Sequence, residues 1–260
     1  MPRKAQTASL ADQHAAPGGA AAVDRALTLL GAYRAGDQGL TLAELAGRTQ
    51  LYKSTVLRLL ASLEHARLIQ RLDDGRYGLG PQVARLHAIY AASFSLDRVV
   101  LPVLRELVAL TGESAAYHVR QGQGAHATRL CLYRVDSSHA VRDHVKAGDL
   151  LPADRGAGAR VLIAFGAGGA KPAAADAALY QRIRAQGYCA MVGDRSAELA
   201  GISAPVFKAD GSAGSAHGAP HGTPHGTLAA ALTLTMPAHR FDEKHIAPLL
   251  AKAQQLSQLI

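Results

Sequence analysis

The sequence predicts an α+β protein, with a helical N-terminal third followed by a mixed α/β region. Apolar residues recur at three- and four-residue intervals through most of the first 110 positions, which is the spacing of amphipathic helices. One hairpin signal lies among these segments. From Glu113 onward, runs of β-forming residues alternate with Gly- and Ala-rich helical segments.

The composition indicates a folded protein of one or two domains. The chain has 260 residues, of which 48% are hydrophobic, so a sizeable core is expected. It contains neither an apolar run of about 18 residues nor the apolar centre of a signal peptide. We therefore expect a cytoplasmic protein with a disordered tail over residues 1–19. Cys131 and Cys189 fit free thiols in a reducing compartment.

Three helical segments are expected before residue 66. The first, "VDRALTLLGAYR", places Val23, Ala26, Leu27 and Leu30 on one face. Thr41 and Glu44 form a capping box that starts a second helix at Leu42. After a break over residues 47–52, a third helix restarts the apolar spacing with Val56, Leu59, Leu60 and Leu63.

A hairpin and two further helices should follow. Asp74-Gly75 suits a type I′ turn in a hairpin from Ile69 to Leu79. Pro81 suits the first turn of a linker helix over residues 81–94. The next helix should run to about Leu110 and be kinked at Pro102.

The third helix has the features of a DNA-reading helix. Its outer face presents small residues around Arg58, and the net charge of +8 favours a polyanionic partner. Such a slim face fits the major groove, where Arg58 can pair with a guanine edge. The hairpin would be a wing. The DNA contacts expected are Thr41, Lys53, Ser54, Thr55, Arg58 and, at the wing tip, Arg76. Alternatively, the first 80 residues serve only dimerisation, and Arg58 lies on an ordinary solvated face.

The order of these elements resembles the IclR-type transcriptional regulators. The motifs are "LYKSTVLRLLASLEHARLI", "DDGRYGLG", "TGESA", "GAGARVLIAF", "QGYC", "GISAPVF" and "AAALTLTMP". The resemblance covers the chain from about Ala20 to its end. It implies a winged helix-turn-helix over 20–80, the linker helix over 81–94, and a GAF-like mixed α/β effector-binding domain over 95–260. It also implies a homodimer or homotetramer that senses a small molecule, often an organic or aromatic acid, and needs no cofactor.

The resemblance also locates an effector site. The family's site matches Gly156 and Ala157 at a helix start, and Thr233 and Thr235, which a strand points to one face. Met191 and Gly201 fall where a family member carries a polar Asp and Cys, which implies a larger and more apolar pocket. Thr233 and Thr235 could instead simply fill a strand, and the two helix-start residues could serve packing alone.

The repeat "HGAPHGTPHGT" places His217, His221 and His225 four residues apart. Interleaved Gly and Pro forbid the helix on which this spacing would make a metal site. We therefore expect a flexible insertion over residues 211–226 and no bound metal.

These features predict a ligand-responsive, sequence-specific DNA-binding regulator, either a repressor or dual-acting, and not an enzyme. The alternative is a small-molecule-processing α/β enzyme with a helical dimerisation domain. Against it, the chain lacks the G-K-[ST], G-x-S-x-G and H-E-x-x-H motifs.

Overall fold

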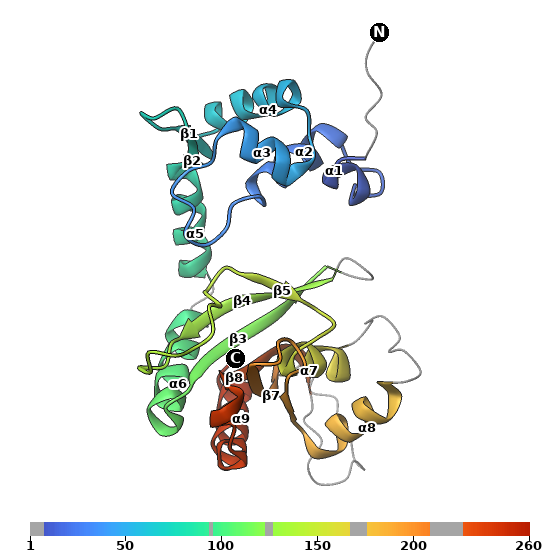
Figure 1. Ribbon diagram of the computed structural model, residues 1–260, viewed down its shortest axis with the longest axis vertical. Helices are drawn as coiled ribbons and strands as arrows, with labels where there is room; N and C mark the ends of the chain where they lie inside the picture. Colours follow the sequence, from blue (N-terminus) through green and yellow to red (C-terminus); the bar gives the residue numbers. More distant parts are fainter. Residues whose placement is uncertain (1–7, 94–95, 123–126, 167–175, 209–225) are drawn as a thin grey trace. The chain divides into compact units, whose positions relative to one another are not determined.

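A computed structural model describes residues 8–93, 96–122, 127–166, 176–208 and 226–260 (Figure 1). The chain divides into two compact units, Met1–Phe94 and Ser95–Ile260. The expected insertion over 211–226, with its three histidines, lies outside the described residues except for Gly226. The α+β fold class is confirmed.

The N-terminal unit consists of helices and a small antiparallel sheet. Its elements are α1 (Leu10–Gln13), α2 (Ala21–Leu30), α3 (Leu42–Thr49), α4 (Lys53–His65), β1 (Ile69–Arg71), β2 (Tyr77–Leu79) and α5 (Pro81–Ser93). Leu40 forms a single bridge to Tyr77 at the outer side of this sheet. The core draws one or more apolar side chains from α2, α3, α4 and both strands, among them Leu29, Leu45, Val56, Leu60, Ile69 and Tyr77.

Local chemistry explains the break between α3 and α4. The predicted capping box is confirmed: the Glu44 N–H donates to Thr41 Oγ1 at 3.2 Å, and the Thr41 N–H donates to Glu44 Oε2 at 2.8 Å. Gln50 then adopts the left-handed region with φ 58°, which ends α3. The chain turns there, so α4 begins in a new direction at Lys53.

Two details of this unit correct the sequence predictions. On α2, the predicted Ala26 and Leu30 pack against the core, but Val23 and Leu27 are 54% and 58% exposed. The fully buried side chain is Leu29, so the apolar face is rotated from the predicted one by part of a turn. Residues 8–19 also include α1, on which Ala11 is buried and Asp12 pairs with Arg25 at 2.7 Å. These contacts order a segment that the sequence assigned to a disordered tail.

The wing turn also differs from the prediction. A type I′ turn needs positive φ at Asp74, but among the described non-glycine residues only Gln50 and Arg67 have positive φ. Gly75 alone takes φ 80° in this turn. Its N–H donates to Leu72 O at 2.9 Å, while the Leu72 N–H donates to Arg76 O at 2.8 Å. This is the pattern of a three-residue loop with a glycine bulge.

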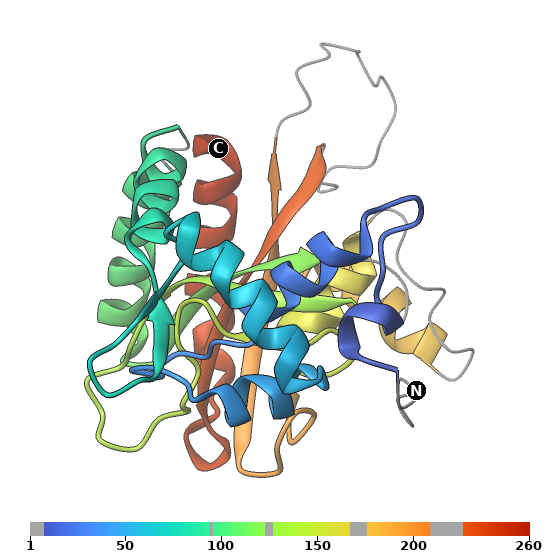
Figure 2. The ribbon, with the colours of Figure 1, turned by 90° about the horizontal axis from the view of Figure 1, so that it is seen from above.

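The C-terminal unit is an antiparallel sheet covered by helices on both faces. Its helices are α6 (Leu96–Thr111), α7 (Ala157–Phe165), α8 (Ala177–Gln186) and α9 (Ile246–Leu259), with 3₁₀ turns at Ala238–Arg240 and Glu243–His245. Its strands are β3 (Ser114–Gln121), β4 (Thr128–Val135), β5 (Leu150–Pro152), β6 (Cys189–Val192), β7 (Leu199–Lys208) and β8 (Thr227–Pro237). The sheet order is β5-β4-β3-β8-β7-β6. Helices α6 and α9 lie on one face, and α7 and α8 lie on the other (Figure 2).

Side-chain alternation along β8 separates the main core from the face below α7. Leu232, Leu234 and Met236 enter the core with α6 and α9. Thr233 and Thr235 therefore point to the face that α7 covers. Helix α6 continues through Pro102, so the sequence-predicted helix to Leu110 is present.

The stretch "HAVRDHV", which reads as β-like, forms no strand. Its Asp143 is buried and makes ion pairs with Arg134 and Arg195. These pairs hold the segment as an irregular loop.

Gly80 and Gly47 offer a matched pair of alanine substitutions. A Cβ on Gly80 would lie 2.2 Å from the backbone oxygen of Arg67, whereas a Cβ on Gly47 would meet nothing within 4 Å. We expect Gly80→Ala to lower the free energy of unfolding by about 1 to 3 kcal/mol. Gly47→Ala, inside α3, should raise it by about 0.4 to 1 kcal/mol. Urea denaturation measures both, and equal effects of the two changes would contradict the crowding at Gly80.

Candidate functional site

The outer face of α4 carries the residues that the sequence assigned to DNA. Val56, Leu60 and Leu63 are buried against the core. Lys53, Ser54 and Arg58 are exposed, and Thr55 is half-buried. Lys53 and Ser54 therefore lie in the first turn of α4, and Arg58 lies about one turn later.

These exposed side chains of α4 are unpaired as far as the described residues show. Within the described part of the chain, the side chains of Lys53, Ser54 and Arg58 make no hydrogen bond or ion pair. Their donors are therefore available to an external ligand. The helix has no acidic residue in its first turn, so its positive end is not neutralised locally.

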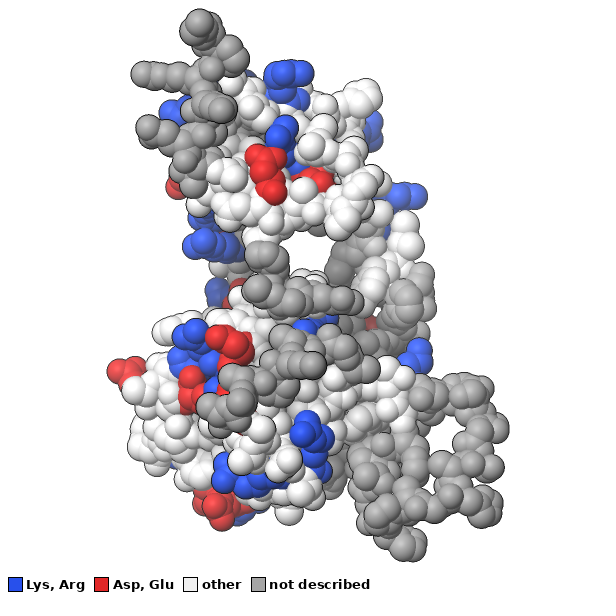
Figure 3. All heavy atoms as spheres, turned by 90° about the vertical axis from the view of Figure 1, so that its right-hand side faces the viewer, with Lys and Arg blue, Asp and Glu red and all other residues white. Residues whose placement is uncertain are grey.

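Two other predicted DNA contacts already have structural roles. The Thr41 hydroxyl donates to Glu44 Oε2 at 2.8 Å within the capping box. Arg76 Nε donates to Asp74 Oδ2 at 2.6 Å across the wing turn. Arg71 on β1, which sequence reasoning missed, is exposed and has no ion pair among the described residues. Figure 3 shows one face, on which the Lys and Arg side chains lie at separate places and not in one continuous patch.

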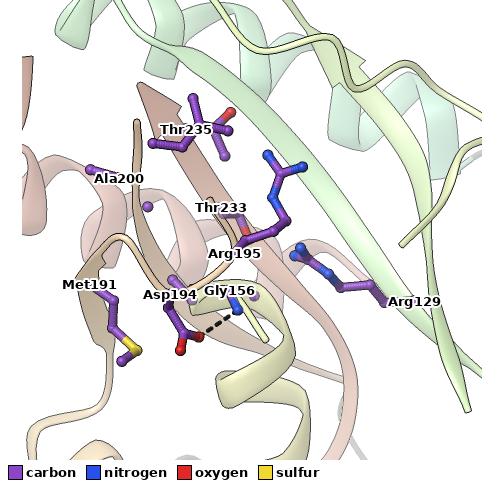
Figure 4. Close-up of a pocket in the computed structure, with 12 residues that line it drawn as sticks. Arg129, Gly156, Met191, Asp194, Arg195, Ala200, Thr233 and Thr235 are labelled. Atoms are coloured by element: carbon purple, nitrogen blue, oxygen red, sulfur yellow. Dashed lines mark hydrogen bonds between the residues drawn. The ribbon is translucent and has the colours of Figure 1, made fainter. Parts of the chain in front are cut away.

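In the C-terminal unit, all of the residues predicted to bind an effector line one pocket (Figure 4). The pocket has a volume of about 340 Å³, its opening to solvent included. The predicted residues around it are Gly156, Ala157, Met191, Gly201, Thr233 and Thr235, and sequence reasoning missed Arg129, Gly158, Asp194, Arg195, Leu199 and Ala200. The geometry brings the predicted set together, while its role in binding stays a prediction.

The first turn of α7 forms one wall of this pocket. Gly156, with φ 86°, precedes the helix, and its N–H donates to Asp194 Oδ2 at 2.5 Å. Asp194 also accepts from Arg160 at 3.0 and 3.1 Å, and these bonds hold the pKa of its carboxyl below the usual value although burial opposes them. The N–H groups of Ala157 and Gly158 belong to the first turn, where a helix supplies no carbonyl partner.

Arg129 is the unusual residue of this site. It lies on β4, is 3% exposed, and makes no hydrogen bond or ion pair with any described residue. Burial, with a smaller contribution from the charge of Arg195, lowers its pKa to about 10, so it is still positively charged at neutral pH. The guanidinium extends from β4 toward the first turn of α7 (Figure 4). An arginine within the otherwise β-forming run "ATRLCLYRV" was the sequence signal that could have identified it.

The two threonines are not equivalent. Thr233 Oγ1 lies 2.9 Å from Ser203 Oγ and 3.3 Å from His118 Nδ1, so it belongs to a buried hydrogen-bond chain. Thr235 Oγ1 is buried and has no hydrogen-bond partner among the described residues. Thr235 is therefore the better placed of the two to bind a ligand.

His118 stands behind the pocket as a neutral side chain. It is 1% exposed, and burial, followed by the charges of Arg129, Arg134 and Arg195, holds its pKa well below the ordinary value. Its Nε2 has no hydrogen-bond partner among the described residues. Because His118 is neutral, it places no second buried positive charge next to Arg129.

This burial predicts a pH dependence of stability. The unfolded chain protonates His118 near pH 6.5, but the folded state does not, so the unfolded state binds more protons below that pH. The unfolding free energy should fall as the pH drops below about 6.5, by up to about 1.4 kcal/mol per pH unit from this group. His118→Gln should remove that part of the slope and leave the slope above pH 7 unchanged. Urea denaturation from pH 5 to 8 measures both, and parallel curves over the whole range would contradict the neutral histidine.

The described ranges also bear on metal binding and on membrane insertion. Within them, no group of three or more His, Cys, Asp or Glu side chains is placed to hold a metal ion. The same ranges contain no helix that combines the length and the apolar character needed to cross a membrane.

Comparisons with known proteins agree with this arrangement. Residues 22–73 match the family model of the IclR helix-turn-helix domain. The HTH-type transcriptional regulator TtgV of Pseudomonas putida is 30% identical over 148 residues, which are 56% of this chain and 55% of that protein. KipR of Bacillus subtilis, also an HTH-type transcriptional regulator, is 28% identical over 126 residues, 48% of this chain and 49% of that protein. The chain thus matches about half the length of these curated relatives.

Solved structures share the fold over most of the chain. An IclR homologue from Microbacterium hydrocarbonoxydans, complexed with 4-hydroxybenzoate, has a TM-score of 0.71 at 20% identity and covers 91% of this chain and 98% of its own. An IclR transcriptional regulator from Alicyclobacillus acidocaldarius has the same TM-score and identity, with 92% and 98% covered. The curated relatives are HTH-type transcriptional regulators. Residues 22–73 are thus similar to the helix-turn-helix domain of IclR-type transcriptional regulators, and most of the chain shares the fold of solved proteins of that type.

Proposed function

We propose that this protein is a sequence-specific, ligand-responsive DNA-binding transcriptional regulator that acts in the cytoplasm as a repressor or with dual sign. The observation that carries the proposal is the outer face of α4. Lys53, Ser54 and Arg58 are exposed there without a structural partner among the described residues, inside the segment that matches the IclR helix-turn-helix domain. Their place in the matched segment distinguishes them from other exposed cations that lack a described partner, such as Arg105 on α6.

The α4 face suits the major groove of B-DNA. Ser54 and Ala61, which lie one turn before and after Arg58, are small and exposed, while the neighbouring Leu57 is 47% exposed. The major groove admits one α-helix. Arg58 would then reach a guanine edge with two donors. Lys53 and the first-turn N–H groups would approach phosphates at the positive end of the helix. Ser54, Thr55, Thr41 and Arg76 remain proposed contacts, the last two in competition with their partners Glu44 and Asp74.

The proposed effector is a small organic or aromatic acid bound in the pocket of the C-terminal unit. The pocket combines the helix start at Gly156 with Thr235 and the apolar Met191. The complex of the Microbacterium hydrocarbonoxydans homologue with 4-hydroxybenzoate supports an aromatic acid as the effector. No metal or other cofactor takes part in the proposed function.

Regulation requires two copies whose reading helices have a fixed spacing. Helix α5 exposes Leu86, Ile89 and Tyr90 by 42% to 49%, an apolar surface that a second copy would cover in a homodimer or homotetramer. Effector binding would bias the orientation of this helix and so the spacing of the two α4 helices. A coupling of about 1 to 3 kcal/mol, roughly 5- to 150-fold in affinity, is sufficient for control.

Arg58→Ala tests the reading role of α4. We expect it to cost about 1 to 3 kcal/mol of binding free energy and to relax specificity at one base pair, because a bidentate contact is lost. Lys53→Ala is the comparison. It should weaken binding to all DNA sequences equally, and it should reduce the slope of log binding constant against log salt concentration by about 0.9. Duplexes selected by the full-length protein from a random library, followed by binding titrations, give both quantities.

Arg105→Ala controls for the change in net charge. Arg105 lies exposed on α6, without an ion pair among the described residues. Its loss should leave specificity unchanged. Unaltered affinity and specificity in both the Arg58 and Lys53 variants would reject α4 as the DNA-reading helix.

A further inference from the structure

We propose that the pocket below α7 takes a monocarboxylic acid with an apolar body, and that Arg129 is the residue that binds its carboxylate. The inference rests on the proposed function only in assuming that this pocket is the effector site. The isolation of the Arg129 charge, the donors that converge beside it, and the apolar opposite wall carry the argument.

Among the described residues Arg129 makes no ion pair, and Asp143 and Asp194 act on its charge only at longer range, whereas other arginines of the same cluster are paired. Arg195 Nη2 lies 3.0 Å from Asp143 Oδ2, and Arg160 Nη2 lies 3.0 Å from Asp194 Oδ1. Arg134 pairs with Asp136 and with Asp143. Arg129, although 3% exposed, pairs with none of these carboxylates. A buried unpaired charge is costly to a folded protein, so a bound anion is the natural explanation for its retention.

Several unpartnered donors surround the same space. Arg129 Nε and Thr235 Oγ1 are both buried without a hydrogen-bond partner among the described residues. The first-turn N–H groups of Ala157 and Gly158 lack carbonyl partners within α7. An ionised carboxylate has two oxygens with about four acceptor sites, which such a set of donors can fill.

Gly158 makes this convergence possible. A Cβ at this position would lie 2.5 Å from Arg129 Nη1 and 2.9 Å from Thr233 Oγ1. A Cβ at Gly156 would lie 3.1 Å from Arg129 Nη2. The guanidinium therefore lies directly against the helix start, so that one carboxylate can contact both.

Three charged residues line the pocket: Arg195 is paired with Asp143 and Asp194 with Arg160, which leaves the charge of Arg129 for one negative charge of a ligand. His118 adds no positive charge, because burial and the nearby arginines keep its pKa low. Asp194, held by Gly156 and Arg160, contributes a carboxylate to the same wall and would repel a second anionic group. Met191, Leu199 and Ala200 line the pocket with apolar atoms that suit the rest of the ligand. Dicarboxylates and phosphate esters fit this distribution poorly.

The test compares acids with their uncharged amides on the full-length protein. Benzoate, phenylacetate and pyruvate are each titrated beside the corresponding amide, with phthalate and succinate as dianions, and thermal unfolding and calorimetry record binding. For the wild type we expect stabilisation by at least one monocarboxylate, and none by its amide or by the dianions. Stabilisation by no monocarboxylate, or equally by acid and amide, would overturn the proposal.

Variants assign the effect to Arg129. Arg129→Met should weaken the bound acid about 10- to 100-fold, the worth of a charge-assisted hydrogen bond. It should also raise the unfolding temperature of the ligand-free protein, because an unpaired buried charge is removed. Arg129→Lys should retain the preference for acid over amide with lower affinity, because it keeps the charge but loses the planar fork. This variant keeps the test decisive if the Met substitution prevents folding.

Arg120→Met is the matched control. Arg120 faces Arg129 across the β3–β4 ladder but does not line the pocket. The Arg120→Met variant should bind the acid with the affinity of the wild type. Unchanged acid affinity in Arg129→Met, or equal losses in both variants, would remove Arg129 from the site. DNA binding is measured separately on the ligand-free protein, so a failure of the regulator proposal would show as absent DNA binding in the wild type, whatever the acids do.

Discussion

The close approach of the first turn of α7 to the sheet is the constraint on which the C-terminal unit depends. Glycines allow it: a Cβ on Gly201 would lie 3.3 Å from the Ala157 Cβ, and a Cβ on Gly158 would collide with Arg129. Asp194 fixes the start of the helix through the Gly156 N–H at 2.5 Å. The result is a helix start, with first-turn N–H groups that have no carbonyl partner in the helix, beside a buried cation. From this geometry and charge we propose an anion-binding site.

The N-terminal unit separates folding from recognition along a single helix. The buried side of α4 holds the core through Val56, Leu60 and Leu63, and its outer side carries Arg58, which has no partner among the described residues. The left-handed conformation of Gln50 lets α3 and α4 take different directions. Substitutions on the two sides of α4 should therefore have separable effects on stability and on binding.

The sequence predicted the features that depend on local chemistry. The capping box at Thr41, the hairpin bounds Ile69 and Leu79, and strand β8 all follow from spacing and turn residues. The phase of α2 and the loop around Asp143 depended on tertiary contacts, which spacing does not encode. Arg129 was missed for the same reason, because its isolation becomes visible only when α7 is packed over β4 and β8.

The proposed regulation requires that a ligand in the C-terminal unit control DNA binding by the N-terminal unit. Its most direct test is the affinity of the full-length protein for its selected duplex, measured with and without a saturating monocarboxylate that binds the pocket. We expect the DNA affinity to change roughly 5- to 150-fold. The affinity for the acid should change by the same ratio when it is measured with and without DNA, because coupling is reciprocal. Equal DNA affinity with and without the acid would show that the pocket does not control DNA binding.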